Sequence, residues 1–234
     1  MKKLFILFIW FCLGSQFLLA QTEQVNGFKL VTYNTKLSQP KSYLIPAVFT
    51  VYGFIALSDN ALRNLNITTR NEIVEDHPNF KTSVDNYLQF SPTVATFALK
   101  LAGIHGEHNN WQSVRLYAES TLLMGLTTYA IKNTAQELRP DGSDHHSFPS
   151  GHTATAFAAA EMMRQEFKNT NPIISYTGYL AAGATGAIRM YNNKHYLGDV
   201  LAGAGIGIIT TKAAYWLDHK LFKFSYQKRG SNID

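Results

Sequence analysis

The sequence contains few charged residues and only one cysteine. Asp, Glu, Lys and Arg together make up 16% of its 234 residues. The single cysteine, Cys12, lies in an apolar N-terminal segment, so a disulfide within the chain and a metal site with cysteine ligands are both excluded. The sequence therefore predicts no disulfide framework and no thiolate-bound metal for this chain.

The chain also lacks internal repeats, low-complexity segments and the polar–apolar alternation that is typical of strands. Long stretches instead combine small and apolar residues at helical spacing. They cover residues 42–58, 86–99, 111–132, 153–167, 173–188 and 197–217. Short connections between such stretches predict an all-α fold, a helical bundle of about five or six core helices.

The charge balance is only mildly basic. The formal net charge is +5, and it falls to +3 if Lys2 and Lys3 are removed with the N-terminal segment. This excess is too small to indicate a nucleic-acid surface, but it is compatible with an anionic lipid surface or a phosphorylated substrate. Nothing in the sequence indicates an obligate protein partner.

The N-terminal segment has the three parts of a secretory signal peptide. A basic start is followed by an apolar middle and by Ala20 before the expected cleavage point. A retained anchor helix is the alternative, because Leu18 is larger than the residue usual at its place. We therefore expect a signal peptide at 1–20, a linker at 21–40, one domain at 41–220 and a polar tail at 221–234.

Three polar clusters interrupt the small and apolar sequence between residues 132 and 199. In the first cluster, Lys132 and Arg139 are separated by two helical turns, so one helix would present both cations on the same face. Pro140 would then end that helix. Two cations suit a doubly charged oxyanion, although two solvated surface cations would show the same pattern.

The second cluster is Ser150, Gly151 and His152, directly before an alanine-rich helical stretch. Serine is a favoured N-cap, and glycine leaves the backbone N–H open to a ligand at a helix N-terminus, where anions bind. His152 adds a group that exchanges protons near neutral pH. The alternative is a capped helix with an incidental histidine.

The third cluster contains Arg189, His195 and Asp199. His195 and Asp199 are four residues apart, so a helix would place them on one face, where the carboxylate could orient the imidazole. We expect Arg189 at the end of the preceding helix, with 192–193 in the turn. A purely structural His–Asp pair is the alternative for this cluster alone.

Taken together, the three clusters resemble the motifs of the type 2 phosphatidic acid phosphatase family, whose superfamily includes bacterial acid phosphatases and vanadium-dependent haloperoxidases. Every spacing within the motifs matches. One departure is Ile188, which stands where the family usually has serine before the arginine, and it affects positioning rather than the reaction. The sequence around His195 is more similar to the membrane lipid-phosphatase branch than to the soluble acid phosphatases.

The resemblance implies a phosphatase that hydrolyses a phosphate monoester without a metal or other cofactor. A lipid phosphate is the favoured substrate. It implies that His195 attacks phosphorus to form a phosphohistidine, that Asp199 orients His195, and that His152 protonates the leaving group and then activates water. The expected phosphate-binding groups are Lys132, Arg139, Ser150, Gly151 and Arg189.

Three rival functions remain open on the sequence. They are a vanadate-dependent haloperoxidase, a non-catalytic protein that binds a phospholipid head group, and a purely structural helical membrane protein. The chain is short for the first, the complete motifs argue against the second, and the third does not explain three polar clusters in apolar surroundings.

The sequence also gives expectations for the location of the protein, for its substrate and for two loops that contain histidines. The resemblance implies a membrane-associated protein of the cell envelope, with its site facing the periplasm or cell exterior. Candidate substrates include phosphatidate, phosphatidylglycerol phosphate, an isoprenyl diphosphate and phosphorylated lipid A. Residues 141–147 are interpreted as a lid over the anion pocket, and residues 103–110 as a plain loop, rather than as metal sites.

Overall fold

A computed structural model describes residues 40–221, which form eight α-helices and one 3-10 turn without any strand. The helices are α2 (Leu44–Ile55), α3 (Ala61–Asp76), α4 (Val84–Leu88), α5 (Ser91–Leu101), α6 (Asn110–Ala135), α7 (Gly151–Phe167), α8 (Pro172–Tyr191) and α9 (Leu197–Leu221), preceded by the turn η1 (Pro40–Tyr43). This architecture confirms the expected all-α class. The signal peptide, nearly all of the linker and the polar tail lie outside the described residues.

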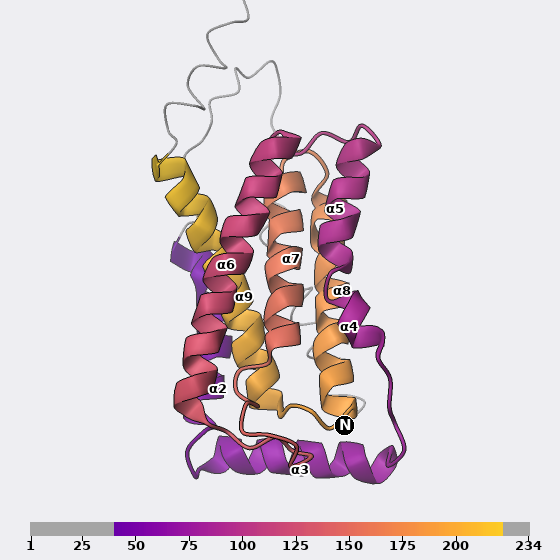
Figure 1. The fold of residues 1–234 in the computed structure, drawn as a ribbon, viewed down its shortest axis with the longest axis vertical. Helices are drawn as coiled ribbons and strands as arrows, with labels where there is room; N and C mark the ends of the chain where they lie inside the picture. The colour runs from indigo at the N-terminus through magenta and orange to yellow at the C-terminus, as the bar shows by residue number, and fades with distance from the viewer. Residues whose placement is uncertain (1–39, 222–234) are drawn as a thin grey trace, which may run out of the picture.

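Helix α7 is the centre of the bundle. It packs most extensively against α8 and α9, and it also contacts α5 and α6 (Figure 1). Its alanines let the neighbouring backbones approach closely, and Ala154, Ala156 and Ala160 are fully buried. Apolar burial around this helix is the main source of the fold's stability.

The largest apolar cluster joins α7 to three other helices. Phe157 of α7 lies in it with Phe49 of α2, Ala182 of α8 and Leu201 of α9. Glycines bring α9 close to two of these helices. A Cβ atom on Gly205 would lie 2.3 Å from the carbonyl oxygen of Pro46 in α2, so a side chain is excluded there.

Helix α3 differs from the others in direction and in composition. It lies across one end of the bundle, roughly perpendicular to the upright helices (Figure 1). Asn60 caps its N-terminus by accepting from the backbone N–H groups of Leu62 and Arg63. Most of its surface is polar, and only Asn66 and Ile73 are buried. It therefore covers the bundle end at which α6 and α8 finish and α7 and α9 begin.

Helix α9 alone, among the described residues, is long and apolar enough to cross a membrane by length and composition. Its segment from Leu197 to Lys220 has a mean hydropathy of 1.3, and 78% of the scored window is buried inside the bundle. A core helix of a bundle meets the same criterion, so this result is compatible with a location inside the protein as well as inside a bilayer.

The closest approach of α7 and α9 predicts how two glycine substitutions will differ. A Cβ on Gly207 would lie 2.3 Å from the carbonyl oxygen of Ala154, whereas a Cβ on Gly183 of α8 would meet nothing within 4 Å. We expect Gly207→Ala to destabilise the fold by about 1–3 kcal/mol through overpacking. Gly183→Ala should instead stabilise it by up to about 1 kcal/mol, because alanine favours the helix. Thermal unfolding of the purified variants measures both, and equal effects would contradict the packing described here.

Candidate active site

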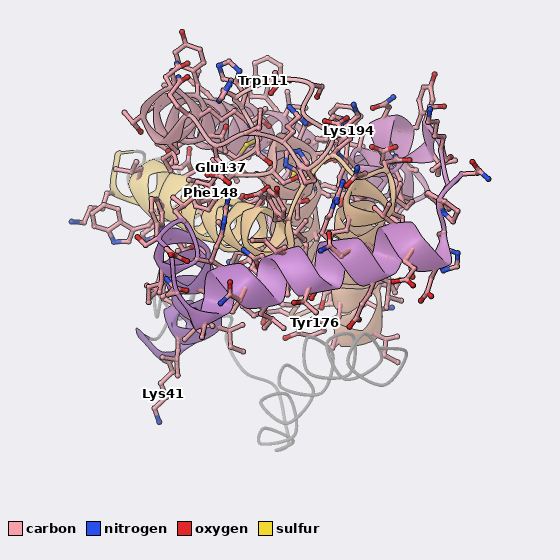
Figure 2. All side chains as sticks on the ribbon, turned by 90° about the horizontal axis from the view of Figure 1, so that it is seen from below. Lys41, Trp111, Glu137, Phe148, Tyr176 and Lys194 are labelled. Carbon is pink, nitrogen blue, oxygen red and sulfur yellow. The ribbon has the colours of Figure 1, made fainter. Side chains whose placement is uncertain are left out.

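The three sequence clusters meet at the bundle end that α3 covers. Lys132 lies in the last turn of α6, His152 in the first turn of α7, Arg189 in the last turn of α8 and Asp199 in the first turn of α9. Figure 2 shows this end, where the labelled Glu137, Phe148 and Lys194 of the connecting segments lie on one side of α3. The fold therefore brings together residues that are up to 67 positions apart in the sequence.

Lys132 and Arg139 reach the site, but they do not share a helix face. Helix α6 ends at Ala135, and Gln136 takes a left-handed conformation with φ of 48°. The expectation of one continuous helix up to Pro140 is therefore wrong. Arg139 lies in the following segment, where its backbone N–H donates to Asp144 O at 2.9 Å. This return of the chain, and not helical periodicity, brings the second cation back to the site.

The start of α7 has the capped structure that the second motif predicted. Ser150 is fully buried, and its Oγ accepts from the backbone N–H of Thr153 at 3.4 Å. A Cβ on Gly151 would lie 3.9 Å from Cε of Lys132, so the glycine backbone lies beside that cation. An anion near Lys132 would thus also face the positive N-terminal end of α7.

Arg189 forms an ion pair with a carboxylate outside the three motifs. Its Nη1 donates to Oδ2 of Asp85 in α4 at 2.7 Å, and Asp85 is 1% exposed. Nε of Arg189 is buried and has no hydrogen-bond partner among the described residues. Asp85 therefore orients the guanidinium, while Nε remains a donor that an anion can satisfy.

His195 precedes α9 instead of lying within it, because that helix begins at Leu197. The expectation that His195 and Asp199 share a helix is wrong, although the two side chains still meet. Nδ1 of His195 lies 3.5 Å from Oδ2 of Asp199, and Nδ1 makes no hydrogen bond among the described residues. Nε2 lies 3.3 Å from Nη1 of Arg139, a donor, so Nε2 is the acceptor nitrogen and Nδ1 carries the hydrogen.

Ser147 completes the surroundings of Asp199. Its Oγ donates to Oδ2 of Asp199 at 2.5 Å, and the backbone N–H of Tyr196 donates to the same oxygen at 2.9 Å. Ser147 is fully buried, and its backbone N–H donates to Glu137 O at 2.9 Å. These bonds fix the carboxylate that faces His195, and they connect it to the segment after α6.

Burial and surrounding cations keep the imidazole of His195 neutral. Burial lowers the pKa of His195 well below its usual range, and the charges of Arg189, Lys132, Arg139 and His152 lower it further. A neutral ring with its lone pair on Nε2 is the nucleophilic form of histidine. The same cations that would hold an oxyanion therefore maintain the reactive state of His195.

His152 has a partner in α4 as well. Its Nε2 lies 2.8 Å from Oδ1 of Asn86, the residue next to Asp85. Burial lowers the pKa of His152, with Arg189 adding to the effect and Asp85 opposing it. A neutral imidazole beside three cations can exchange a proton with a group that is bound between them.

Three side chains of α3 support the segments that carry the motifs. Arg63 forms a 2.5 Å ion pair with Glu137 of the first segment, and Arg70 donates to Pro140 O at 3.0 Å. Arg70 also donates to Oδ1 of Asn193, in the turn after α8, at 2.8 Å. Oδ1 of Asn66 accepts from the backbone N–H of Gly198 in α9 at 3.1 Å. Helix α3 thus joins the first and third motifs from outside.

The segment expected as a lid lies over the cations. Residues 141–146 are exposed, and the backbone oxygen of His146 accepts from Nζ of Lys132 at 2.6 Å. Oδ1 of Asp144 accepts from Nε of Arg139 at 2.8 Å. His108 of the second histidine-containing loop contacts Glu166 of α7 at 2.8 Å. Within residues 40–221, no three metal-ligating side chains form a group.

Sequence reasoning missed the supporting residues Asp85, Asn86 and Ser147, and the role of α3. Asp85 and Asn86 carried only a weak signal, as two polar residues at the border of an apolar stretch. Ser147 was included in the expected lid, although its adjacency to the second motif could have indicated a role in the site. The contacts of α3 had no local signal, because its partners lie far away in the sequence.

Comparisons with known proteins confirm the resemblance inferred from the motifs. A family model described as the PAP2 superfamily matches residues 113–223, which include all three motifs. Lipid A 1-phosphatase of Porphyromonas gingivalis is 38% identical over 145 residues, which are 62% of this chain and 33% of that protein. The match thus spans about a third of the length of this relative.

Two solved structures are similar to parts of this chain. One is the first transmembrane PAP2-type phosphatidylglycerolphosphate phosphatase from Bacillus subtilis, which is 19% identical with a TM-score of 0.51. That match covers 77% of this chain and 98% of the other. The second is Aquifex aeolicus LpxE, which is 20% identical with a TM-score of 0.48, covering 62% of this chain and 93% of the other. The first likeness supports the helical fold.

The protonation of Lys132 predicts how anion binding depends on pH. Burial lowers the pKa of Lys132 to about 8, and Arg139 contributes to this decrease. Lys132 is therefore charged below about pH 8 and loses its proton above it. By linkage, each pH unit above this value should weaken orthophosphate binding by up to about tenfold.

Calorimetric titration with orthophosphate between pH 7 and pH 9.5 tests this expectation. Lys132→Arg is the matched control, because arginine keeps its charge over the whole range. Any effect of phosphate ionisation is common to both proteins. The same pH slope in both would show that Lys132 does not contribute its charge to anion binding.

Proposed function

We propose that this chain, whose residues 113–223 match the PAP2 superfamily, is a phosphatase that hydrolyses a phosphate monoester of a lipid. The observation that carries this proposal is the convergence of three cations on one neutral histidine. The charges of Lys132, Arg139 and Arg189 all lower the pKa of the buried His195. This arrangement matches a dianionic phosphoryl group that is attacked by a nitrogen nucleophile.

In the proposed reaction, Nε2 of His195 attacks phosphorus while the bond from phosphorus to the leaving oxygen breaks. His152 acts in this step as the imidazolium, with a hydrogen on both ring nitrogens; it gives one proton to that oxygen and becomes neutral, so the alcohol leaves in neutral form. Water then attacks the phosphohistidine, His152 takes its proton, and the phosphorus–nitrogen bond breaks to release orthophosphate. Asp199 stabilises the positive charge that develops on His195, and Ser147 holds Asp199 in place.

The phosphoryl oxygens would be held by side-chain cations and by backbone dipoles. Lys132, Arg139 and Arg189 supply three positive charges, and the start of α7 at Ser150 and Gly151 supplies backbone N–H groups. These donors are sufficient to balance the charge of a phosphoryl dianion. The mechanism therefore needs no metal ion and no cofactor.

The outer surfaces of the bundle support a lipid substrate and association with a membrane. Large apolar side chains are exposed on Leu44, Val48, Val51 and Ile55 of α2, Val94 and Leu101 of α5, Leu122, Leu126 and Tyr129 of α6, and Ile173 and Leu180 of α8. Such extended exposed apolar surface is unusual for a protein surrounded only by water. We propose contact with lipid along these faces, with the site end directed toward the periplasm or cell exterior.

Phosphorylated lipid A is the first substrate to test, because the P. gingivalis relative is named Lipid A 1-phosphatase. Purified protein should release orthophosphate from lipid A 1-phosphate, and a panel with phosphatidate, phosphatidylglycerol phosphate and an isoprenyl diphosphate gives its preference. EDTA should leave the rate unchanged, and vanadate should inhibit as a trigonal-bipyramidal analogue of the phosphoryl group. Absence of release from every substrate would contradict the proposed activity, and loss in EDTA that a divalent ion restores would contradict the metal-free mechanism.

The two histidines should respond differently to the leaving group. His195→Ala removes the nucleophile, so phosphoryl transfer from every substrate should be lost. His152→Ala removes the proton donor, so transfer from a lipid phosphate should fall by roughly 10²–10⁴-fold. Nitrophenolate leaves without a proton, so transfer from nitrophenyl phosphate should be much less impaired. Burst measurements on both substrates test this difference, and equal damage to the transfer step would show that His152 is not the acid.

A further inference from the structure

Helix α4 places two adjacent polar residues against the candidate site, and neither belongs to the three motifs. Asp85 accepts from Arg189 at 2.7 Å, and Asn86 contacts Nε2 of His152 through Oδ1 at 2.8 Å. The first contact orients a cation of the anion pocket. The second involves the residue that transfers protons in the proposed reaction, so its geometry bears on which ring nitrogen carries the proton.

We propose that Asn86 is a positioning residue that fixes the tautomer of His152 and makes Nδ1 the nitrogen that exchanges the proton. This inference rests on the proposed phosphatase function for the role of His152. The tautomer itself follows from the contact between Asn86 and His152 and can be measured without turnover.

The chemistry of the amide determines which nitrogen is free. Oδ1 of Asn86 is an acceptor only, so Nε2 of His152 must donate the hydrogen. A neutral imidazole has a single N–H group, so its lone pair is then on Nδ1. When Nδ1 takes up a proton, the bond from Nε2 to Asn86 is retained. The proton can therefore pass to the leaving oxygen from Nδ1, and later from water to Nδ1, without reorientation of the ring.

The charges near His152 favour its neutral form. The charges of Arg189 in α8, Arg139 in the segment after α6 and Lys132 in α6 lower the pKa of His152, whereas the charge of Asp85 in α4 raises it. Burial and these cations favour the uncharged ring. A neutral ring has two tautomers, and a neighbour that accepts at Nε2 selects one of them. The amide does so without adding a charge to the pocket.

Several contacts fix α4, and with it Asn86. The backbone N–H of Asn86 donates to Ser83 O at 3.1 Å, and Nε2 of Gln89 donates to Asn86 O at 2.9 Å. Oδ1 of Asn192 accepts from the backbone N–H of Thr82 at 3.0 Å, while its Nδ2 donates to Thr82 O at 2.9 Å. Asn192 caps the end of α8, so α4 is aligned with the helix that carries Arg189.

Nitrogen NMR of the full-length protein labelled with ¹⁵N-histidine tests the tautomer directly. His152→Gln identifies the resonances of His152 by their absence. We expect the Nε2–H tautomer in the unaltered protein and a loss of this preference in Asn86→Ala. An Nδ1–H tautomer in the unaltered protein would overturn the proposal, whatever the variant shows. If the tautomer is as expected and no substrate is hydrolysed, the proposed function fails while the assignment of Asn86 stands.

Kinetics then test the consequence for proton transfer. Asn86→Ala should slow phosphoryl transfer from a lipid phosphate by about tenfold, less than the roughly 10²–10⁴-fold expected for loss of the acid. Transfer from nitrophenyl phosphate should change little. Asn64→Ala is the matched control, because Asn64 is exposed on α3 at the same end of the bundle. Equal slowing of both substrates by Asn86→Ala would show a general structural defect and would contradict the proposal.

Asn86→Asp provides a second variant of nearly the same shape. A carboxylate opposite Nε2 stabilises the imidazolium, so the pKa of His152 should rise by about one unit or more. His152 must be protonated to act as the acid, so the alkaline limb of the kcat profile for a lipid phosphate should move to higher pH. Asn64→Asp adds the same charge away from His152 and should leave the limb in place. An unchanged limb in Asn86→Asp would contradict the contact on which the proposal rests.

Discussion

The candidate site depends on the close approach of α7 and α9. Where these helices begin, the backbone N–H of Ser150 donates to the carbonyl oxygen of Asp199 at 3.0 Å. Gly203 permits this contact, because a Cβ at that position would lie 2.5 Å from Ser150 O. A single backbone hydrogen bond thus sets the second motif against the third, and the surrounding small residues allow the helices to pack at the distance that this bond requires.

The site concentrates positive charge where it is partly removed from water. Three neighbouring cations repel one another and lose part of their hydration on burial. Ion pairs with carboxylates offset part of this unfavourable free energy. Asp85 pairs with Arg189, and Asp144 pairs with Arg139 from the exposed segment. Each carboxylate engages only part of its guanidinium. The candidate site therefore keeps at least one donor, Nε of Arg189, that a bound anion can satisfy.

Two helices outside the motifs give the site its rigidity. Helix α3 joins the first and third motif segments through Arg63, Asn66 and Arg70, and α4 supports Arg189 and His152 through Asp85 and Asn86. Both helices come from the part of the chain before the segment that matches the PAP2 superfamily. The reactive residues and the residues that hold them therefore come from different regions of the sequence.

The sequence by itself determined the helical class, the long helices and the identity of the residues that meet at the site, because periodicity and motif spacing are local properties. It also placed Arg189 at a helix end and Ser150 at a helix start. It did not determine that Arg139 reaches the site through a chain reversal after Gln136, or that His195 precedes its helix. Nor did it reveal the partners Asp85, Asn86 and Ser147. Those features were decided by the tertiary structure, because they arise from contacts between segments whose separation in the chain carries no periodic signal.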